Sequence, residues 1–117
     1  MNTRLLDRHT QRQLAVYLPD LRTARNLAEI FSLFADTSCL RMLSAFSISE
    51  MCVTDLASSL GMNQATVSHQ LKLLKTAGLV DFTRQGKVIF YRIASPKINE
   101  VILGGVEYLG FPSQGHQ

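Results

Sequence analysis

The sequence lacks the features of several large classes of protein. It has only two cysteines and no CxxC pair, whereas a small secreted disulfide scaffold needs more cysteines. No stretch approaches the run of about 18 apolar residues that spans a bilayer. Residues 1–20 lack the continuous apolar core of a signal peptide. We therefore expect a cytoplasmic protein with reduced thiols and no membrane partner.

Charge of one sign is not in large excess either. The chain has 117 residues, enough for one domain, and its formal net charge of +3 is only mildly basic. Such a balance does not by itself identify a nucleic-acid partner. The positions of the basic residues say more, because a group of them lies in the stretch that carries the clearest structural pattern: Lys72, Lys75, Arg84, Lys87 and Arg92.

That stretch, residues 51–92, begins with two predicted helices. Val53–Leu60 has apolar residues at helical spacing, and Gly61 after it is typical of a helix end. Asn63 is a suitable N-cap for the next helix, Gln64–Ala77, which contains no acidic residue. In this helix Val67, Leu71 and Leu74 are spaced to form one buried line. The pattern predicts two helices joined by a tight turn.

Two strands follow these helices. Leu79–Arg84 and Val88–Ile93 are rich in Val, Ile, Phe and Tyr, and Gln85-Gly86-Lys87 joins them, which predicts a β-hairpin with a basic tip. This order is the plan of a winged helix-turn-helix, whose second helix enters the major groove of DNA. A helical hairpin packed on a small sheet is the alternative, but the turn residues, helix polarity and wing charge agree better with DNA binding.

Further helices are predicted on both sides. One helix spans Leu21–Ala35, another is capped by Asp36 or Thr37 and runs to Ile48, and Ser95-Pro96 begins the helix Lys97–Leu109. The fold class is mainly α with a small β-hairpin, in the order α-α-α-α-α-β-β-α. We expect an N-terminal helix or arm at 1–20, a DNA-binding domain at 21–94, a dimerisation helix at 95–110 and a disordered tail at 111–117.

The last predicted helix contains two adjacent glycines, Gly104 and Gly105. Each glycine costs a helix about 1 kcal/mol relative to alanine. Close packing of two helices is one reason for small residues there, and it fits a homodimer in which the first and last helices of each chain meet their partners. The alternative is a terminal helix that packs on its own core with a local kink.

Several segments of the chain resemble the ArsR/SmtB repressors. They are Cys52-Val53-Thr54-Asp55-Leu56, Val67-Ser68-His69-Gln70-Leu71, Gly78-Leu79-Val80 and Arg84-Gln85-Gly86-Lys87. The resemblance runs from about Leu27 to Tyr91. It implies a dimeric winged-helix repressor that binds an inverted repeat in double-stranded operator DNA, and many such repressors release DNA when they bind a metal.

The residues expected to contact DNA lie on the second helix and on the wing. The resemblance implies that Gln64, Ser68 and His69 face the groove, although His69 could instead be a half-buried contact with the wing. Glutamine can pair bidentately with adenine, while lysine and arginine suit phosphate. The complete predicted set is Gln64, Thr66, Ser68, His69, Gln70, Lys72, Arg84 and Lys87.

A candidate effector site lies at the start of Val53–Leu60. Cys52 and Asp55 are three residues apart, so at a helix start their side chains point the same way. The resemblance implies a metal bound by this cysteine, a nearby partner and the N-terminal arm, where His9 aligns with a histidine ligand. The set His9, Cys52 and Asp55 suits zinc or a similar divalent ion as an effector, with no cofactor required.

Cys52 and Asp55 could have purely structural roles, and the protein could have other functions. Cys52 could be a small buried hydrophobe and Asp55 a stabiliser of a helix N-terminus. Cys39 and Cys52 could instead bridge in a thiol-based redox or sulfide-responsive repressor, if their Cα atoms lie within about 7 Å. A constitutive repressor and a protein-interaction module are further alternatives, and the basic wing argues against the module. No oxyanion-type glycine loop or third orienting residue accompanies Cys52 with His9 or His69, so we expect no enzyme.

Overall fold

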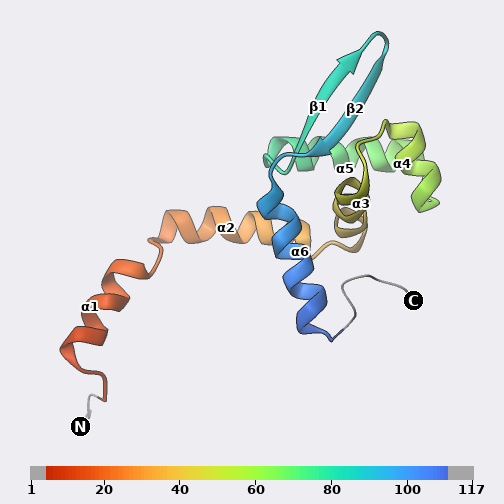
Figure 1. The fold of residues 1–117 in the computed structure, drawn as a ribbon. Helices are drawn as coiled ribbons and strands as arrows, with labels where there is room; N and C mark the ends of the chain where they lie inside the picture. The colour runs from red at the N-terminus through yellow and green to blue at the C-terminus, as the bar shows by residue number, and fades with distance from the viewer. Residues whose placement is uncertain (1–4, 111–117) are drawn as a thin grey trace. The chain divides into compact units, whose positions relative to one another are not determined.

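The computed structural model describes residues 5–110, in which five helices precede a β-hairpin and one helix follows it (Figure 1). The elements are α1 (Arg8–Tyr17), α2 (Leu21–Phe34), α3 (Thr37–Ile48), α4 (Val53–Leu60), α5 (Gln64–Thr76), β1 (Val80–Gln85), β2 (Val88–Ile93) and α6 (Pro96–Tyr108). This order and the fold class, mainly α with one small hairpin, are the predicted ones and are confirmed. Contacts divide the chain into two units, residues 1–31 and 32–117, with the boundary inside α2.

The first unit contains α1 and most of α2. Asp7 caps α1 because its Oδ1 accepts a hydrogen bond of 2.7 Å from the backbone N–H of Thr10. Asp20 accepts in the same way from Thr23 at the start of α2, over 2.8 Å. None of residues 8–17 is buried, and the side chain of Tyr17 is 80% exposed. Local capping therefore shapes α1, and no core within its own unit covers it.

The second unit has its core between α3, α4 and α5. The largest fully buried side chains are Met42 and Leu43 from α3, Leu56 from α4, and Val67, Leu71 and Leu74 from α5. The three α5 residues lie at helical spacing along one face, which the sequence predicted as the buried line. The burial of one face of α5 leaves its opposite face free for another role.

A tight turn joins α4 to α5, as predicted. Gly61 ends α4 in the left-handed conformation, with φ of 65°, and the backbone N–H of Met62 bonds the carbonyl of Ala57 at 2.9 Å. Asn63 then caps α5, because its Oδ1 accepts from the backbone N–H of Ala65 at 2.7 Å. Both predicted end signals are confirmed, and together they fix the approach of α5 to α4.

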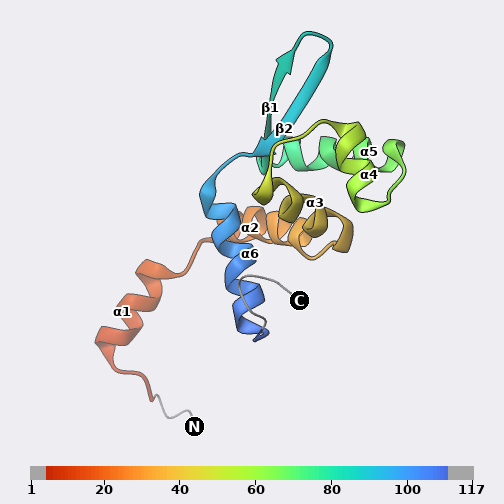
Figure 2. The same ribbon diagram turned by 45° about the vertical axis from the view of Figure 1, so that its right-hand side comes forward.

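The hairpin extends away from α4 and α5 in both views (Figures 1 and 2). Its antiparallel pairs run from Val80 opposite Ile93 to Gln85 opposite Val88, so only two residues form the turn. At its base, Met51 and Tyr91 exchange backbone hydrogen bonds of 3.1 and 2.9 Å. The sequence did not predict this bridge, which ties the wing to the segment before α4.

Helix α6 follows β2 and packs on α3 and β2. Ser95 caps it and Pro96 is its first residue, as predicted. The hydroxyl of Ser47 on α3 donates a hydrogen bond to Oδ1 of Asn99 on α6. No helix among residues 5–110 is long and apolar enough to cross a membrane. The predicted disordered tail lies outside the described residues.

Candidate nucleic-acid interface

The exposed face of α5 carries most of the residues predicted to contact DNA. Gln64, Thr66, Ser68, His69 and Lys72 are all exposed, while Val67, Leu71 and Leu74 face the core. His69 therefore lies in solvent and is not half-buried against the wing. Because α5 has no acidic side chain, this face offers hydrogen-bonding groups and positive charge without a group that repels phosphate.

Gln70 lies differently from the other predicted contacts on α5. Its side chain is half-buried, and its Nε2 donates a hydrogen bond of 3.4 Å to Oδ2 of Asp36, the N-cap of α3. Its Oε1 is buried without a hydrogen-bond partner among the described residues. The amide therefore faces α3, which suits a role in holding α5 on α3 and not a contact with a base.

The tip of the hairpin carries two exposed cations, Arg84 and Lys87, on either side of Gln85-Gly86. Gly86 has φ of 64°, a conformation that other residues rarely adopt, so glycine is required at this turn. The wing thus carries its positive charge at its tip, where both side chains are exposed and can contact the DNA backbone.

Two other cations near the interface are engaged within the chain. The Nζ atom of Lys75 lies 4.0 Å from the centre of the Phe82 ring, a cation–π contact between α5 and β1. Arg92 pairs with Asp81 at 3.4 Å and donates to the Thr83 hydroxyl at 2.5 Å. Sequence reasoning missed both contacts, although the register opposing Asp81 and Arg92 would have indicated the second.

Two of the three predicted metal ligands lie together at the start of α4. Cys52 is its half-buried N-cap, and its side chain makes no capping hydrogen bond in the described structure. Asp55 is exposed in the first turn of the same helix. A thiolate and a carboxylate at this spacing fit two positions of a zinc-type site. The third candidate, His9, is exposed on α1 in the other unit, and residues 5–110 of one chain assemble no group of three or more potential ligands.

The two cysteines have different surroundings. Cys39 is 1% exposed, and burial raises the pKa of its thiol to about 11, helped by a hydrogen bond to Asp36 and by the charge of that carboxylate. A thiol with this pKa is almost entirely protonated at neutral pH and is a poor nucleophile. Cys39 is therefore a core residue, and Cys52 is the more accessible thiol.

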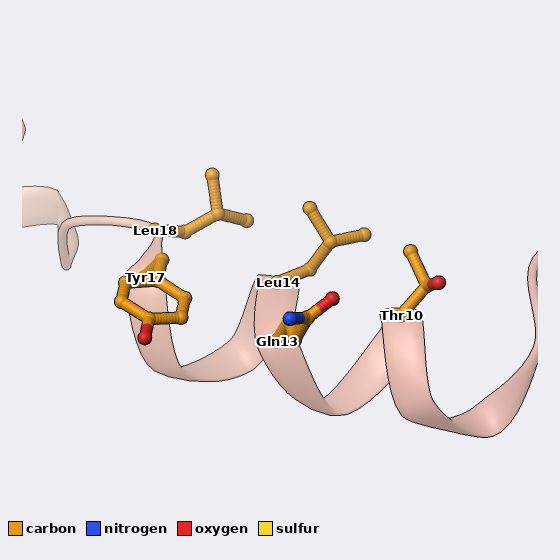
Figure 3. Close-up of a pocket in the computed structure, with 5 residues that line it drawn as sticks. All are labelled: Thr10, Gln13, Leu14, Tyr17 and Leu18. Atoms are coloured by element: carbon orange, nitrogen blue, oxygen red, sulfur yellow. The ribbon is translucent and has the colours of Figure 1, made fainter.

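A shallow groove runs along α1, lined by Thr10, Gln13, Leu14, Tyr17 and Leu18. Figure 3 shows Thr10, Leu14 and Leu18 projecting in one direction, with Gln13 and Tyr17 beside them. The groove is built from one helix and contains no acid, base or thiol, so it suits contact with another protein surface and not chemistry.

A family model and individual relatives both identify this chain as similar to bacterial regulatory proteins. The model of bacterial regulatory proteins of the arsR family matches residues 37–81, from the start of α3 into β1. A transcriptional repressor SmtB homolog from Synechocystis is 40% identical over 83 residues, 71% of this chain and 63% of that protein, so the chain spans less than two thirds of this relative. The cadmium resistance transcriptional regulatory protein CadC from Listeria innocua is 32% identical over 71% of each chain.

A solved structure supports the fold. The homodimeric winged helix-turn-helix DNA-binding domain of a possible ArsR-family regulator from Mycobacterium bovis superposes with a TM-score of 0.68. The two sequences are 28% identical, and the match covers 80% of this chain and 88% of the other. The winged helix-turn-helix predicted from the sequence is thereby confirmed.

Proposed function

Because this chain belongs to the arsR family of bacterial regulatory proteins, we propose that it is a sequence-specific transcriptional repressor that binds operator DNA as a homodimer. The observation that carries the proposal is the exposed polar face of α5, which lies beside a wing with two free cations at its tip. A repressor acts where the DNA is, so we place the protein in the cytoplasm, and repression as in the relatives named transcriptional regulators requires no catalytic reaction.

Recognition divides between base edges and phosphates. Gln64 fits adenine through its amide, and Ser68 and His69 offer further hydrogen-bonding groups in the first turns of α5. Lys72 on α5 and the two tip cations of the wing suit phosphate, which fixes position but carries no sequence information. The partner chain repeats these contacts on the second half of an inverted repeat, with half-sites about 34–36 Å apart or a multiple of that.

The homodimer has candidate surfaces at both ends of the chain. The α1 helix exposes apolar side chains such as Leu14 and Tyr17. On α6, Val101 and Leu103 are exposed, and a Cβ atom added to Gly104 or Gly105 would meet no described atom within 4 Å. Packing within one chain therefore does not require these glycines, which supports their role against a second copy. The M. bovis relative is a homodimer, as its solved structure records.

The effector is proposed to be a divalent metal such as zinc. Cys52 and Asp55 would hold it at the start of α4, with His9 from an N-terminal arm as the third ligand. A bound cation would tie the arm to the start of α4 and shift the dimer from a geometry that binds DNA to one that does not. If binding releases DNA, then DNA must weaken the metal affinity by the same factor. The CadC relative is a cadmium resistance regulator, which supports a metal as the effector.

The thiol-based alternative is less favoured by the structure. A bridge between Cys39 and Cys52 needs Cys39 as a reacting thiol, and its burial beside Asp36 keeps it protonated. Cys52 alone could react with an oxidant at the start of α4.

Fluorescence anisotropy separates these proposals. The purified protein would be titrated onto DNA from its own promoter with chelator, with excess Zn²⁺ and with a mild thiol oxidant. We expect binding with chelator and its loss with Zn²⁺, and Cys52→Ser should abolish the Zn²⁺ response. Loss with oxidant alone would favour the thiol sensor, a response to neither would leave a constitutive repressor, and no binding under any condition would refute the repressor itself.

A further inference from the structure

The first residue of α5, Gln64, has a hydrogen-bond partner on the neighbouring helix α4. Its Nε2 donates a hydrogen bond of 3.4 Å to Oγ1 of Thr54. Both side chains are exposed, and α4 and α5 pack together in the helix-turn-helix. The bond therefore joins the helix proposed to read bases to the helix that supports it.

The orientation of the Gln64 amide decides which base edge it can read. A bidentate pair with adenine needs the amide oxygen as acceptor from N6 and one N–H as donor to N7. An amide nitrogen has two N–H groups, so the second can stay on Thr54 while the pair forms. This bond leaves the adenine-reading edge of Gln64 free and favours one direction for that edge.

Thr54 is well suited to hold a flexible side chain in place. It is β-branched, so its χ1 angle is restricted within a helix. It also lies in the first turn of α4, whose following residues Leu56 and Ala57 are buried in the core. Gln64 is long and loses rotamer freedom when it is fixed on a base. A partner on a packed helix orders it before DNA arrives, which reduces that loss on binding.

We propose that Thr54 is a positioning residue that orients Gln64 for adenine recognition, an inference that rests on the proposed DNA-binding function. Thr54 contacts no base itself and acts through Gln64. It lies between Cys52 and Asp55, so any ligand held by those two side chains would act on the same turn that orients Gln64.

A double-mutant cycle tests this role. The unchanged protein would first select a duplex from a randomised pool, and base substitutions in that duplex would identify the adenine whose loss no longer matters in Gln64→Ala. Affinity for the selected duplex and for an unrelated duplex would then be measured for Thr54→Val, Thr54→Ser, Gln64→Ala and the double variant Thr54→Val/Gln64→Ala. Thr54→Val keeps the shape of the side chain and removes the hydroxyl, while Thr54→Ser keeps the hydroxyl.

We expect Thr54→Val to bind the selected duplex about 3- to 10-fold more weakly, the size of one hydrogen bond, and the unrelated duplex unchanged. Thr54→Ser should restore binding, and Thr54→Val should add no loss to Gln64→Ala. Equal losses on both duplexes, the same loss in the Gln64→Ala background, or no loss at all would overturn the role of Thr54 alone. Failure of the unchanged protein to select any duplex would overturn the proposed function, and the inference with it.

Discussion

Residues 32–110 build a core, whereas residues 5–31 form helices without one. In the larger region Leu43 is fully buried. In the smaller region Leu14 and Tyr17 are 42% and 80% exposed, although both lie on a regular helix. Helix formation is therefore encoded separately from core formation, and a region with apolar side chains but no core is one that a partner chain can cover.

The largest effect is expected where the core is complete. Leu43→Ala removes a side chain that is 0% exposed between α3 and its neighbours, and should lower the free energy of unfolding by about 2–5 kcal/mol. Thermal unfolding followed by circular dichroism would show it. Leu14→Ala is the matched control on α1 and should shift the transition far less in dilute protein. Equal shifts would contradict the division into a region with a core and a region without one.

A charge placed on α1 tests whether the region without a core is covered by a partner chain. Leu14→Asp should weaken the homodimer, because an apolar side chain of this size contributes about 1.5–3 kcal/mol when it is covered. Sedimentation equilibrium would detect a dissociation constant about 10- to 100-fold higher. Ala15→Asp, on the same helix but outside the groove, controls for the added charge. A dimer unaffected by Leu14→Asp would remove α1 from the interface.

A smaller effect is expected at the N-cap of α3. Asp36 accepts a hydrogen bond of 2.9 Å from the backbone N–H of Cys39 and a second from Gln70. Asp36→Ala should cost about 1 kcal/mol, the usual loss for a missing N-cap. Asp7 caps only α1, so Asp7→Ala should leave the main unfolding transition unchanged. The comparison fails if the two substitutions shift that transition equally.

The buried thiol of Cys39 should make the free energy of unfolding depend on pH. Its pKa is raised from 9.0 to about 11 in the folded protein, so the folded state keeps a proton that the unfolded state loses. Stability should therefore fall as the pH rises from about 9 towards 11 and be unaffected by this group below 9. Urea unfolding of the unchanged protein and of Cys39→Ala isolates the contribution as their difference. A difference that does not vary with pH in this window would contradict the raised pKa.

The smallest expected effect is on the salt dependence of DNA binding, and it distinguishes an exposed cation at the tip of the wing from one that is paired within the chain. Arg84→Ala should weaken binding to all DNA sequences alike and reduce the slope of log K against log salt by about 2, because one phosphate per chain, and so two per dimer, is no longer neutralised. Arg92→Ala is the matched control, because Arg92 already pairs with Asp81 and Thr83. Anisotropy titrations over a range of salt would measure both slopes, and an equal change would show that Arg92 also contacts DNA.

Sequence reasoning succeeded where the signal is local. Gly61 and Asn63 predicted the turn between α4 and α5, and Ser95 predicted the start of α6, because caps act within a few residues of themselves. The buried line of α5 followed from helical spacing in the same way. Helix ends differed from the predictions by about one residue, where fraying leaves the boundary to small energy differences.

What the sequence did not show depends on how distant elements meet. Gln70 was grouped with the DNA contacts because it lies outside the buried line of α5, yet its amide donates to Asp36 at the start of α3. The bridge between Met51 and Tyr91 joins segments that are far apart in the sequence. Lys75 looks like a free cation until β1 places Phe82 beneath it. No local pattern encodes these contacts, since each follows from how separate elements pack together.

The most direct test of the central claim is the salt dependence of binding between the unchanged protein and a duplex from its own promoter. Lys72, Arg84 and Lys87 of both chains would neutralise about six phosphates, which predicts a slope of log K against log salt of about −5. Saturable binding with a steep slope of this kind is the expected result. Binding that does not change with salt, or no saturable binding at low salt, would contradict the assignment of α5 and the wing as a DNA-binding surface.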